Sequence, residues 1–134
     1  MRAYFLEPLL RSGRKDWTLV HGPSGRVIAD DLHTAFDSAS RRSGLLQQSD
    51  WPIGSALIIA PCQAVHTVGM RFAIDVLLVN RVGRVVRVRE RVRSWRVVVA
   101  LTAFAAIELP AGTLAGTVQA GDRLSVSQGN SGVE

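Results

Sequence analysis

The 134-residue sequence predicts an α+β fold. We expect a single compact, β-rich domain in which about seven strands form a curled mixed or antiparallel sheet, or a partial barrel, with one main helix. Short apolar runs bounded by Gly, Pro, Asn or Asp recur along most of the chain, which is typical of strands joined by turns. Only residues 35–47 place apolar side chains at near-helical spacing.

The N-terminal part of the chain predicts a hairpin followed by that helix. Residues 17–21 and 26–30 are short apolar-rich runs on either side of a Gly-Pro-Ser-Gly turn, so they are expected to pair. The helix is expected over residues 35–47, with Asp31 or Thr34 as its N-terminal cap.

The remaining expected elements are strands. Residues 55–60 and 74–80 are apolar almost throughout, as expected of strands that are buried on both faces. An Asn-Arg-Val-Gly turn then leads into a strand over residues 84–93. Further strands are expected at 103–109 and 123–127, each bordered by Gly.

Composition indicates one ordinary globular domain spanning residues 1–134, with a polar tail at 128–134. The hydrophobic content is 47% and the charged content 20%. A lone cysteine cannot form an internal disulfide, and no run approaches the ~20 apolar residues of a membrane span. The N-terminus lacks the apolar region of a signal peptide. We therefore expect a soluble, cytoplasmic protein.

The formal charge is +5, and all sixteen basic residues except Lys15 are arginine. Such a skew is typical of a GC-rich genome, so it is weak evidence for a nucleic-acid partner. In residues 84–93 the arginines share one parity and the valines the other, which places the two sets on opposite faces of a strand. The arginine set is Arg87, Arg89, Arg91 and Arg93, and the valine set is Val86, Val88 and Val92.

This basic face has a functional and a structural interpretation. It suits an anionic partner such as RNA or lipid headgroups. It also suits a solvated strand whose charges discourage edge pairing. Because no aromatic residue is interleaved before Trp95, the sequence disfavours nucleic acid. Glu90 falls among the valines and is expected to pair with Arg96 or with an arginine of another strand.

The stretch 62-CQAVHTVGMRFAIDVLLV-79 combines Cys62, His66 and Asp75. In an extended chain Cys62 and His66 lie roughly 13 Å apart, which disfavours a nucleophile–base pair. One Cys and one His are too few for a zinc site, so no metal is expected. The structural alternative makes Cys62 a small packed residue and makes Asp75 an acceptor for backbone N–H groups of a preceding turn.

Five ordered blocks of the chain resemble the bacterial and archaeal family known as domain of unknown function 192. The blocks are Arg42-x-Gly44-Leu45-Leu46; Cys62 with His66-Thr67, Met70-Arg71-Phe72 and Ile74-Asp75-Val76; Gly83-x-Val85-Val86; Glu108-Leu109-Pro110-Ala111-Gly112; and Gly121-Asp122-Arg123-Leu124. The chain departs at Ala73 and Ser94, where the family has Pro. The resemblance covers a family-like core over about residues 18–127. It implies a bacterial protein with a compact β-rich α+β domain and no established activity.

If relatives share a pocket, the resemblance implies this lining: His66, Thr67, Met70, Asp75, Glu108 and Gly112. The leading hypothesis is a binding or accessory module, without a cofactor, that presents a polar patch of His66, Thr67 and Asp75 to a protein partner or a small ligand. The second is a hydrolase or transferase with His66 as base, Asp75 as orienting group, and Cys62 or water as nucleophile. The third is a polyanion-binding protein that uses the arginine-rich strand.

Overall fold

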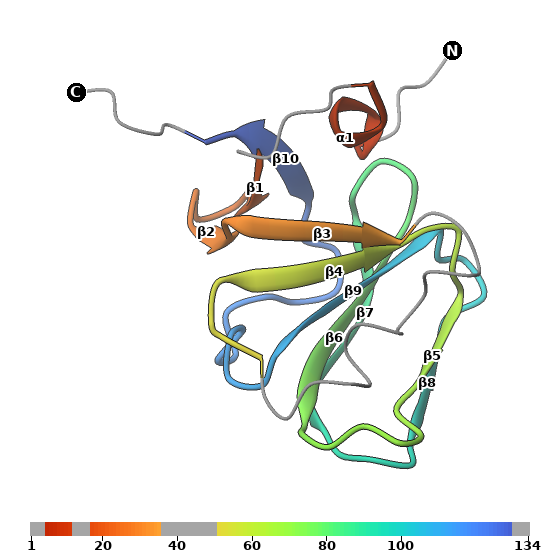
Figure 1. Cartoon of the computed structure of the whole chain (residues 1–134). Helices are drawn as coiled ribbons and strands as arrows, with labels where there is room; N and C mark the ends of the chain where they lie inside the picture. Colours follow the sequence, from red (N-terminus) through yellow and green to blue (C-terminus); the bar gives the residue numbers. More distant parts are fainter. Residues whose placement is uncertain (1–4, 12–16, 36–50, 130–134) are drawn as a thin grey trace.

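The computed structural model describes residues 5–11, 17–35 and 51–129, which form one short helix and ten strands (Figure 1). In chain order these are α1 (Glu7–Arg11), β1 (Trp17–His21), β2 (Val27–Ala29), β3 (Asp31–Ala35), β4 (Ser55–Ile59), β5 (Ala64–His66), β6 (Ile74–Val79), β7 (Val85–Val92), β8 (Val97–Val99), β9 (Ala105–Pro110) and β10 (Leu124–Gln128).

A five-stranded sheet with the order β3-β4-β9-β6-β7 is the centre of the fold. β3 pairs with β4 in parallel, and the other neighbours are antiparallel. Every residue of β4, β6 and β9 is buried, which agrees with their apolar sequences and shows that both faces of the sheet are covered.

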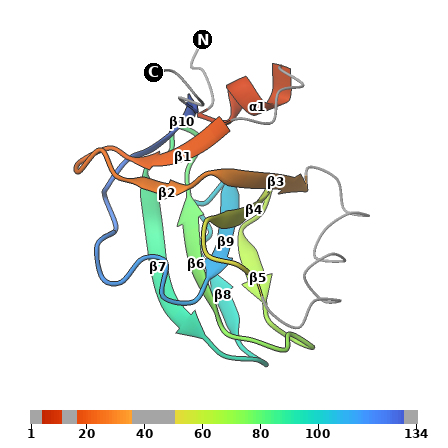
Figure 2. The same cartoon turned by 60° about the vertical axis from the view of Figure 1, so that its left-hand side comes forward.

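Because side chains alternate along a strand, the sheet separates two apolar clusters. On one face, Leu77 and Ile107 pack with Leu19 of β1 and Leu124 of β10; we call this the β1-side face. The other face, the ribbon-side face, carries residues such as Leu78 and packs against β5 and β8 (Figure 2).

Two smaller sheets cover these faces. The first has the order β10-β1-β2. The second is the antiparallel pair β5–β8, called the ribbon below, in which Val65 lies opposite Val98 and His66 opposite Val97. Val65 and Val98 are buried in the ribbon-side cluster, whereas the residues on either side of them are exposed.

The expectation of a compact, β-rich domain is confirmed, but the strand count and the α+β label are not quite matched, since the described residues form ten strands and one five-residue helix. The seven expected strands correspond to β1, β2, β4, β6, β7, β9 and β10. The helix α1 and the strands β3, β5 and β8 were not expected. The described strands form three separate sheets, and these do not close into a barrel.

A helix was expected over residues 35–47. Apart from Ala35, these residues lie in the segment 36–50, which is outside the described part of the chain. Ala35, together with the expected caps Asp31 and Thr34, belongs to β3 and pairs with β4 residue by residue. The capping interpretation is therefore wrong. A polar residue before an apolar run also suits an edge strand, and pairing with a buried neighbour overrides the local preference.

The expected separation of arginines and valines on β7 holds only for Arg87, Val88 and Arg89. Two bulges each add one residue to β7 relative to β6, and each bulge reverses the alternation of faces. Arg87 and Arg89 lie opposite Leu78 and Val76 on the ribbon-side face. Arg91 sits in one bulge with a φ of 54°, and Arg93 follows the end of the strand.

The valines of β7 are divided between the two faces for the same reason. Val86 and Val92 pack in the ribbon-side cluster, and Val88 packs in the β1-side cluster. A continuous four-arginine stripe is therefore not formed.

Candidate functional site

Asp75 is a fully buried carboxylate near the start of β6. Its Oδ1 accepts the backbone N–H of Arg91 at 2.9 Å, and its Oδ2 accepts that of Leu114 at 3.0 Å. The prediction that Asp75 accepts backbone N–H groups is confirmed. The donors, however, come from the β7 bulge and from the loop after β9, not from a preceding turn.

Thr67 is also fully buried, and its groups hold the turn at residues 93–96. Its hydroxyl donates to the C=O of Arg93 at 2.7 Å and accepts the N–H of Arg96 at 2.9 Å. Its own N–H donates to the C=O of Arg96 at 2.9 Å. This network supports Trp95, which adopts a φ of 66°.

His66 is exposed, and its Nδ1 accepts the N–H of Val68 at 3.3 Å. Since Thr67 and Asp75 are buried, the three residues do not form a polar surface patch. The Asp75 oxygens are occupied by backbone groups of other segments, so Asp75 does not orient His66. Cys62 is half-buried and donates from Sγ to the C=O of Ala64 at 3.1 Å.

The other carried-over residues lie apart from one another. Glu108 is fully buried between Leu57 and Val76 on the ribbon-side face, while Asp75 occupies the opposite parity on β6. Met70 is buried in the same cluster as Val76. Gly112, with a φ of 93°, borders a separate hollow of about 290 Å³ beside β2. The six residues therefore do not line a common cavity.

Glu90 does not pair with an arginine among the described contacts. It is exposed, and its Oε2 accepts the backbone N–H of Gly116 at 2.9 Å. The bulge that follows Arg89 turns the side chain towards this loop, which strand parity could not have indicated.

Within residues 5–11, 17–35 and 51–129, no group of three or more His, Cys, Asp and Glu side chains is arranged to hold a metal ion. None of the helices in these ranges is long and apolar enough to cross a membrane.

A Ser–His–Asp constellation that sequence reasoning missed joins the first hairpin to the last strand. His21 is buried; its Nε2 lies 2.8 Å from Oδ2 of Asp122, and its Nδ1 lies 2.7 Å from Oγ of Ser24. Because a carboxylate only accepts hydrogen bonds, the neutral imidazole carries its proton on Nε2, and in that form Nδ1 accepts from the Ser24 hydroxyl. The hydrogen bond from His21, with a second from the N–H of Gln119, lowers the pKa of Asp122 below its ordinary value.

The hydrogen bonds run between Asp122, His21 and Ser24 in the order found in a catalytic triad, but the backbone N–H groups near Ser24 are used elsewhere. The N–H of Arg26 donates to Ser24 Oγ, and the N–H of Gly25 donates to the C=O of His21. These two donors are therefore not available to stabilise an oxyanion beside Ser24. The side chains instead fasten the turn to the segment before β10.

The outer face of the ribbon is the second feature that sequence reasoning missed. Val97 is 69% exposed and Val99 45% exposed, and both point away from the buried core residue Val98. Trp95 and Leu101, two residues beyond either valine, are 69% and 79% exposed. Exposed large apolar side chains this close together in sequence are typical of interaction sites. The sequence signal was an alternation of large apolar residues from position 95 to 101.

Comparison with known families identifies the fold. Residues 20–126 match the family described as "Uncharacterized ACR", domain of unknown function 192. The chain belongs to this family. The resemblance seen in the ordered sequence blocks is therefore confirmed. No curated protein matches the chain.

Two crystal structures share the domain of unknown function 192 fold seen here. A candidate transcription regulator of Sinorhizobium meliloti 1021 is 20% identical with a TM-score of 0.69, and the match covers 82% of this chain and 91% of that one. A protein of unknown function from Novosphingobium aromaticivorans DSM 12444 is 19% identical with a TM-score of 0.66, and the match covers 81% and 82%. At these identities the likeness concerns the fold alone.

Proposed function

We propose that this domain is a binding module that docks an extended, acidic and apolar segment of a partner protein on the outer face of the ribbon. The observation that supports this most directly is the exposed series Trp95, Val97, Val99 and Leu101. Val97 and Val99 lie at alternate positions of β8, and Trp95 and Leu101 lie just outside its two ends. Exposed large apolar side chains cost solubility and suit a partner that buries them.

The backbone of the ribbon supports an extended partner. The hydrogen bonds from Ala100 N–H to Gln63 C=O and from Thr67 N–H to Arg96 C=O lie at its two ends. By the alternation of an antiparallel pair, the N–H and C=O groups of Val97 and Val99 point away from β5. Among the described strands β8 pairs only with β5, so this edge can accept an added strand.

The charge around the ribbon favours an acidic segment. Arg93 and Arg96 are exposed on either side of Trp95, and the whole chain carries +5. A lipid surface would also attract these charges, but it offers no backbone groups to the strand edge. His66, opposite Val97, adds an imidazole to the centre of the same face.

The test is a selection of random ten-residue peptides by display on the wild-type domain. Enriched peptides are expected to alternate apolar with acidic residues. Their binding to Val97→Ser/Val99→Ser is expected to weaken by about tenfold or more, since each loss of 1.4 kcal/mol costs a factor of ten. Val27→Ser, at an exposed valine of β2, is the matched control and should bind as the wild type does.

Enriched peptides that lack acidic residues, or that bind the double variant and the wild type equally, would refute the proposal. Sedimentation with phosphatidylglycerol vesicles is the competing arm. Binding of the wild type to those vesicles, lost in the double variant and without any selected peptide, would assign the face to a membrane surface instead.

A further inference from the structure

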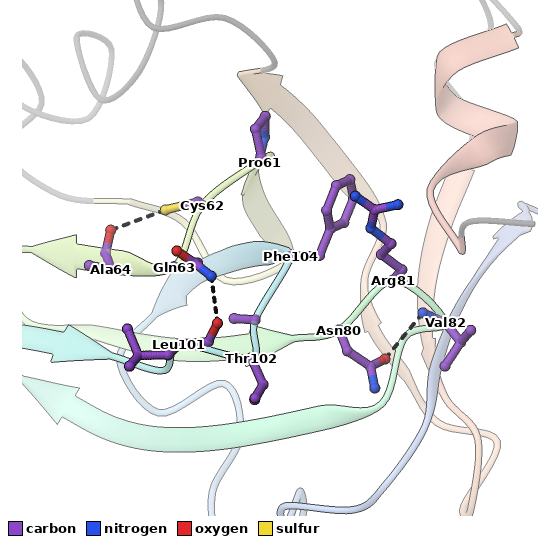
Figure 3. A pocket seen from close by; sticks show the side chains of 11 residues that line it. Pro61, Cys62, Gln63, Ala64, Asn80, Arg81, Val82, Leu101, Thr102 and Phe104 are labelled. Atoms are coloured by element: carbon purple, nitrogen blue, oxygen red, sulfur yellow. Dashed lines mark hydrogen bonds between the residues drawn. The ribbon is translucent and has the colours of Figure 1, made fainter.

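A pocket of about 740 Å³ lies beyond one end of the ribbon, between residues 61–64, 80–82 and 101–104 (Figure 3). Of the residues singled out from the sequence as nucleophile, ligand or pocket candidates, only Cys62 lines it. The pocket is therefore a feature separate from the buried positions of Asp75 and Glu108.

Hydrogen bonds hold the walls of this pocket in place. The N–H of Cys62 donates to the C=O of Phe104 at 2.8 Å, and the N–H of Phe104 donates to the C=O of Val79 at 2.7 Å. Gln63 donates from Nε2 to the C=O of Leu101 (Figure 3). A pocket whose walls are tied across the chain is largely formed before a ligand arrives.

The turn that carries Arg81 is equally constrained. Oδ1 of Asn80 accepts the N–H of Val82 at 3.1 Å and that of Arg84 at 2.9 Å. This leaves the Nδ2 of Asn80 as the donating end of its amide. The C=O of Arg81 accepts the N–H of Phe5 at 2.9 Å. The backbone of Arg81 is therefore held by this bond as well as by the turn that Asn80 stabilises.

The lining of the pocket combines one cationic side chain, Arg81, with apolar side chains. The guanidinium of Arg81 lies over the ring of Phe104, 5.0 Å from its centroid. Leu101, Ala103 and the ring supply apolar contacts, and Thr102 adds a hydroxyl group. The guanidinium fork binds carboxylate and phosphate oxygens in the same two-pronged way.

We propose that this pocket binds a small organic anion, with its carboxylate or phosphate on the guanidinium of Arg81 and its apolar body against Phe104 and Leu101. Thr102 and the Nδ2 of Asn80 supply further donors to the anion. The Cys62 thiol takes no covalent part, because it donates to a carbonyl of its own loop.

The experiment is an amide NMR titration of the intact chain with benzoate, phenyl phosphate and the neutral analogue benzyl alcohol. Saturable shifts are expected at residues 61–64, 80–82 and 101–104 with an anion and not with benzyl alcohol. Tighter binding of benzoate assigns a carboxylate, and tighter binding of phenyl phosphate assigns a phosphate.

Variants separate the pocket from general attraction to a basic protein. Arg81→Gln is expected to weaken anion binding about tenfold or more, and Arg81→Lys less, since a charge remains without the fork. Arg89→Gln, at an exposed arginine of β7, is the matched control and should bind as the wild type does.

Equal binding by wild type and Arg81→Gln, or an equal loss in Arg89→Gln, would overturn the proposal, as would shifts of the same size with benzyl alcohol. The Val97→Ser/Val99→Ser variant should keep its anion response. A failure of peptide docking and a failure of anion binding are therefore distinguishable.

Discussion

Asp75 joins two segments that lie 16 and 39 residues away along the chain. It is a carboxylate in an apolar core, and such a group is stable there only when hydrogen bonds replace its hydration. The backbone N–H groups of Arg91 and Leu114 supply those bonds. The side chain that was considered as an orienting group for a catalytic His66 thus stabilises the fold instead.

Asp75→Asn tests this role. An asparagine keeps the shape but presents one N–H₂ donor to a backbone N–H, which leaves that buried donor without an acceptor. We expect the free energy of unfolding to fall by roughly 3 kcal/mol in urea titration. Asp31→Asn, at the exposed start of β3, is the control and should change it by less than about 1 kcal/mol. Equal stability of both variants would contradict the fastening role.

At the residue scale, sequence predicted the kind of bond but not the partners. Asp75 could be recognised as an acceptor because it interrupts an apolar run. Its donors depend on a bulge and on a distant loop, which no local pattern encodes. Thr67 was expected in a polar patch with His66 and Asp75, yet it is buried, and its hydroxyl bonds the backbone of the turn at residues 93–96.

Among the elements, the turn between β6 and β7 depends on its glycine. Gly83 has a φ of 89°, its C=O accepts the N–H of Leu124 at 2.7 Å, and a Cβ at this position would overlap the C=O of Leu124. The turn and the start of β10 therefore approach each other more closely than any side chain permits.

We expect Gly83→Ala to reduce the free energy of unfolding clearly more than Gly25→Ala does. Gly25 also has a positive φ, 73°, but a Cβ there meets no atom within 4 Å. The Gly25 variant carries only the backbone cost of about 1 kcal/mol. Thermal unfolding of the two variants gives the comparison, and an equal loss would show that the contact with Leu124 is unimportant.

Element prediction succeeded where strands are long and apolar, and failed where they are short. β4, β6 and β9 are recognisable because burial on both faces demands an almost wholly apolar run. β5 and β8 have three residues each, too few to establish a period. β3 is polar at its first position and at two central ones, and it is a strand because β4 offers it a partner.

At the scale of the whole molecule, His21 and Asp122 connect parts of the chain that are 101 residues apart. The hydrogen bond from His21 is the largest cause of the lowered pKa of Asp122, followed by that from the N–H of Gln119. A group whose pKa is lower in the folded state contributes stability above its unfolded pKa, and loses that contribution as the pH falls through its folded pKa.

Removing the carboxylate should therefore have a pH-dependent effect. The stability difference between wild type and Asp122→Asn is expected to shrink as the pH falls through and below the ordinary Asp pKa of 3.8. Urea titrations across this range measure it. A difference that grows towards acid pH would contradict the assigned direction of the shift.

The order of the central strands, β3-β4-β9-β6-β7, was beyond reach of the sequence. β9 inserts between β4 and β6, although the three are separated in the chain by the ribbon strands and β7. Apolar composition identifies these strands as central but does not rank the pairings between them. The two-sided burial of the sheet could be anticipated, whereas the elements that cover each side could not.

The way in which Asp75 binds also determines how freely its surroundings can be redesigned. The carboxylate contacts only main-chain atoms, so it imposes no side-chain identity at position 91. Arg91 is exposed, and its positive φ is one that glycine or asparagine adopts readily. An engineer can therefore change the charge of this edge by replacing the Arg91 side chain, which takes no part in the hydrogen bond from its backbone N–H to Asp75. Position 75 itself accepts no comparable change.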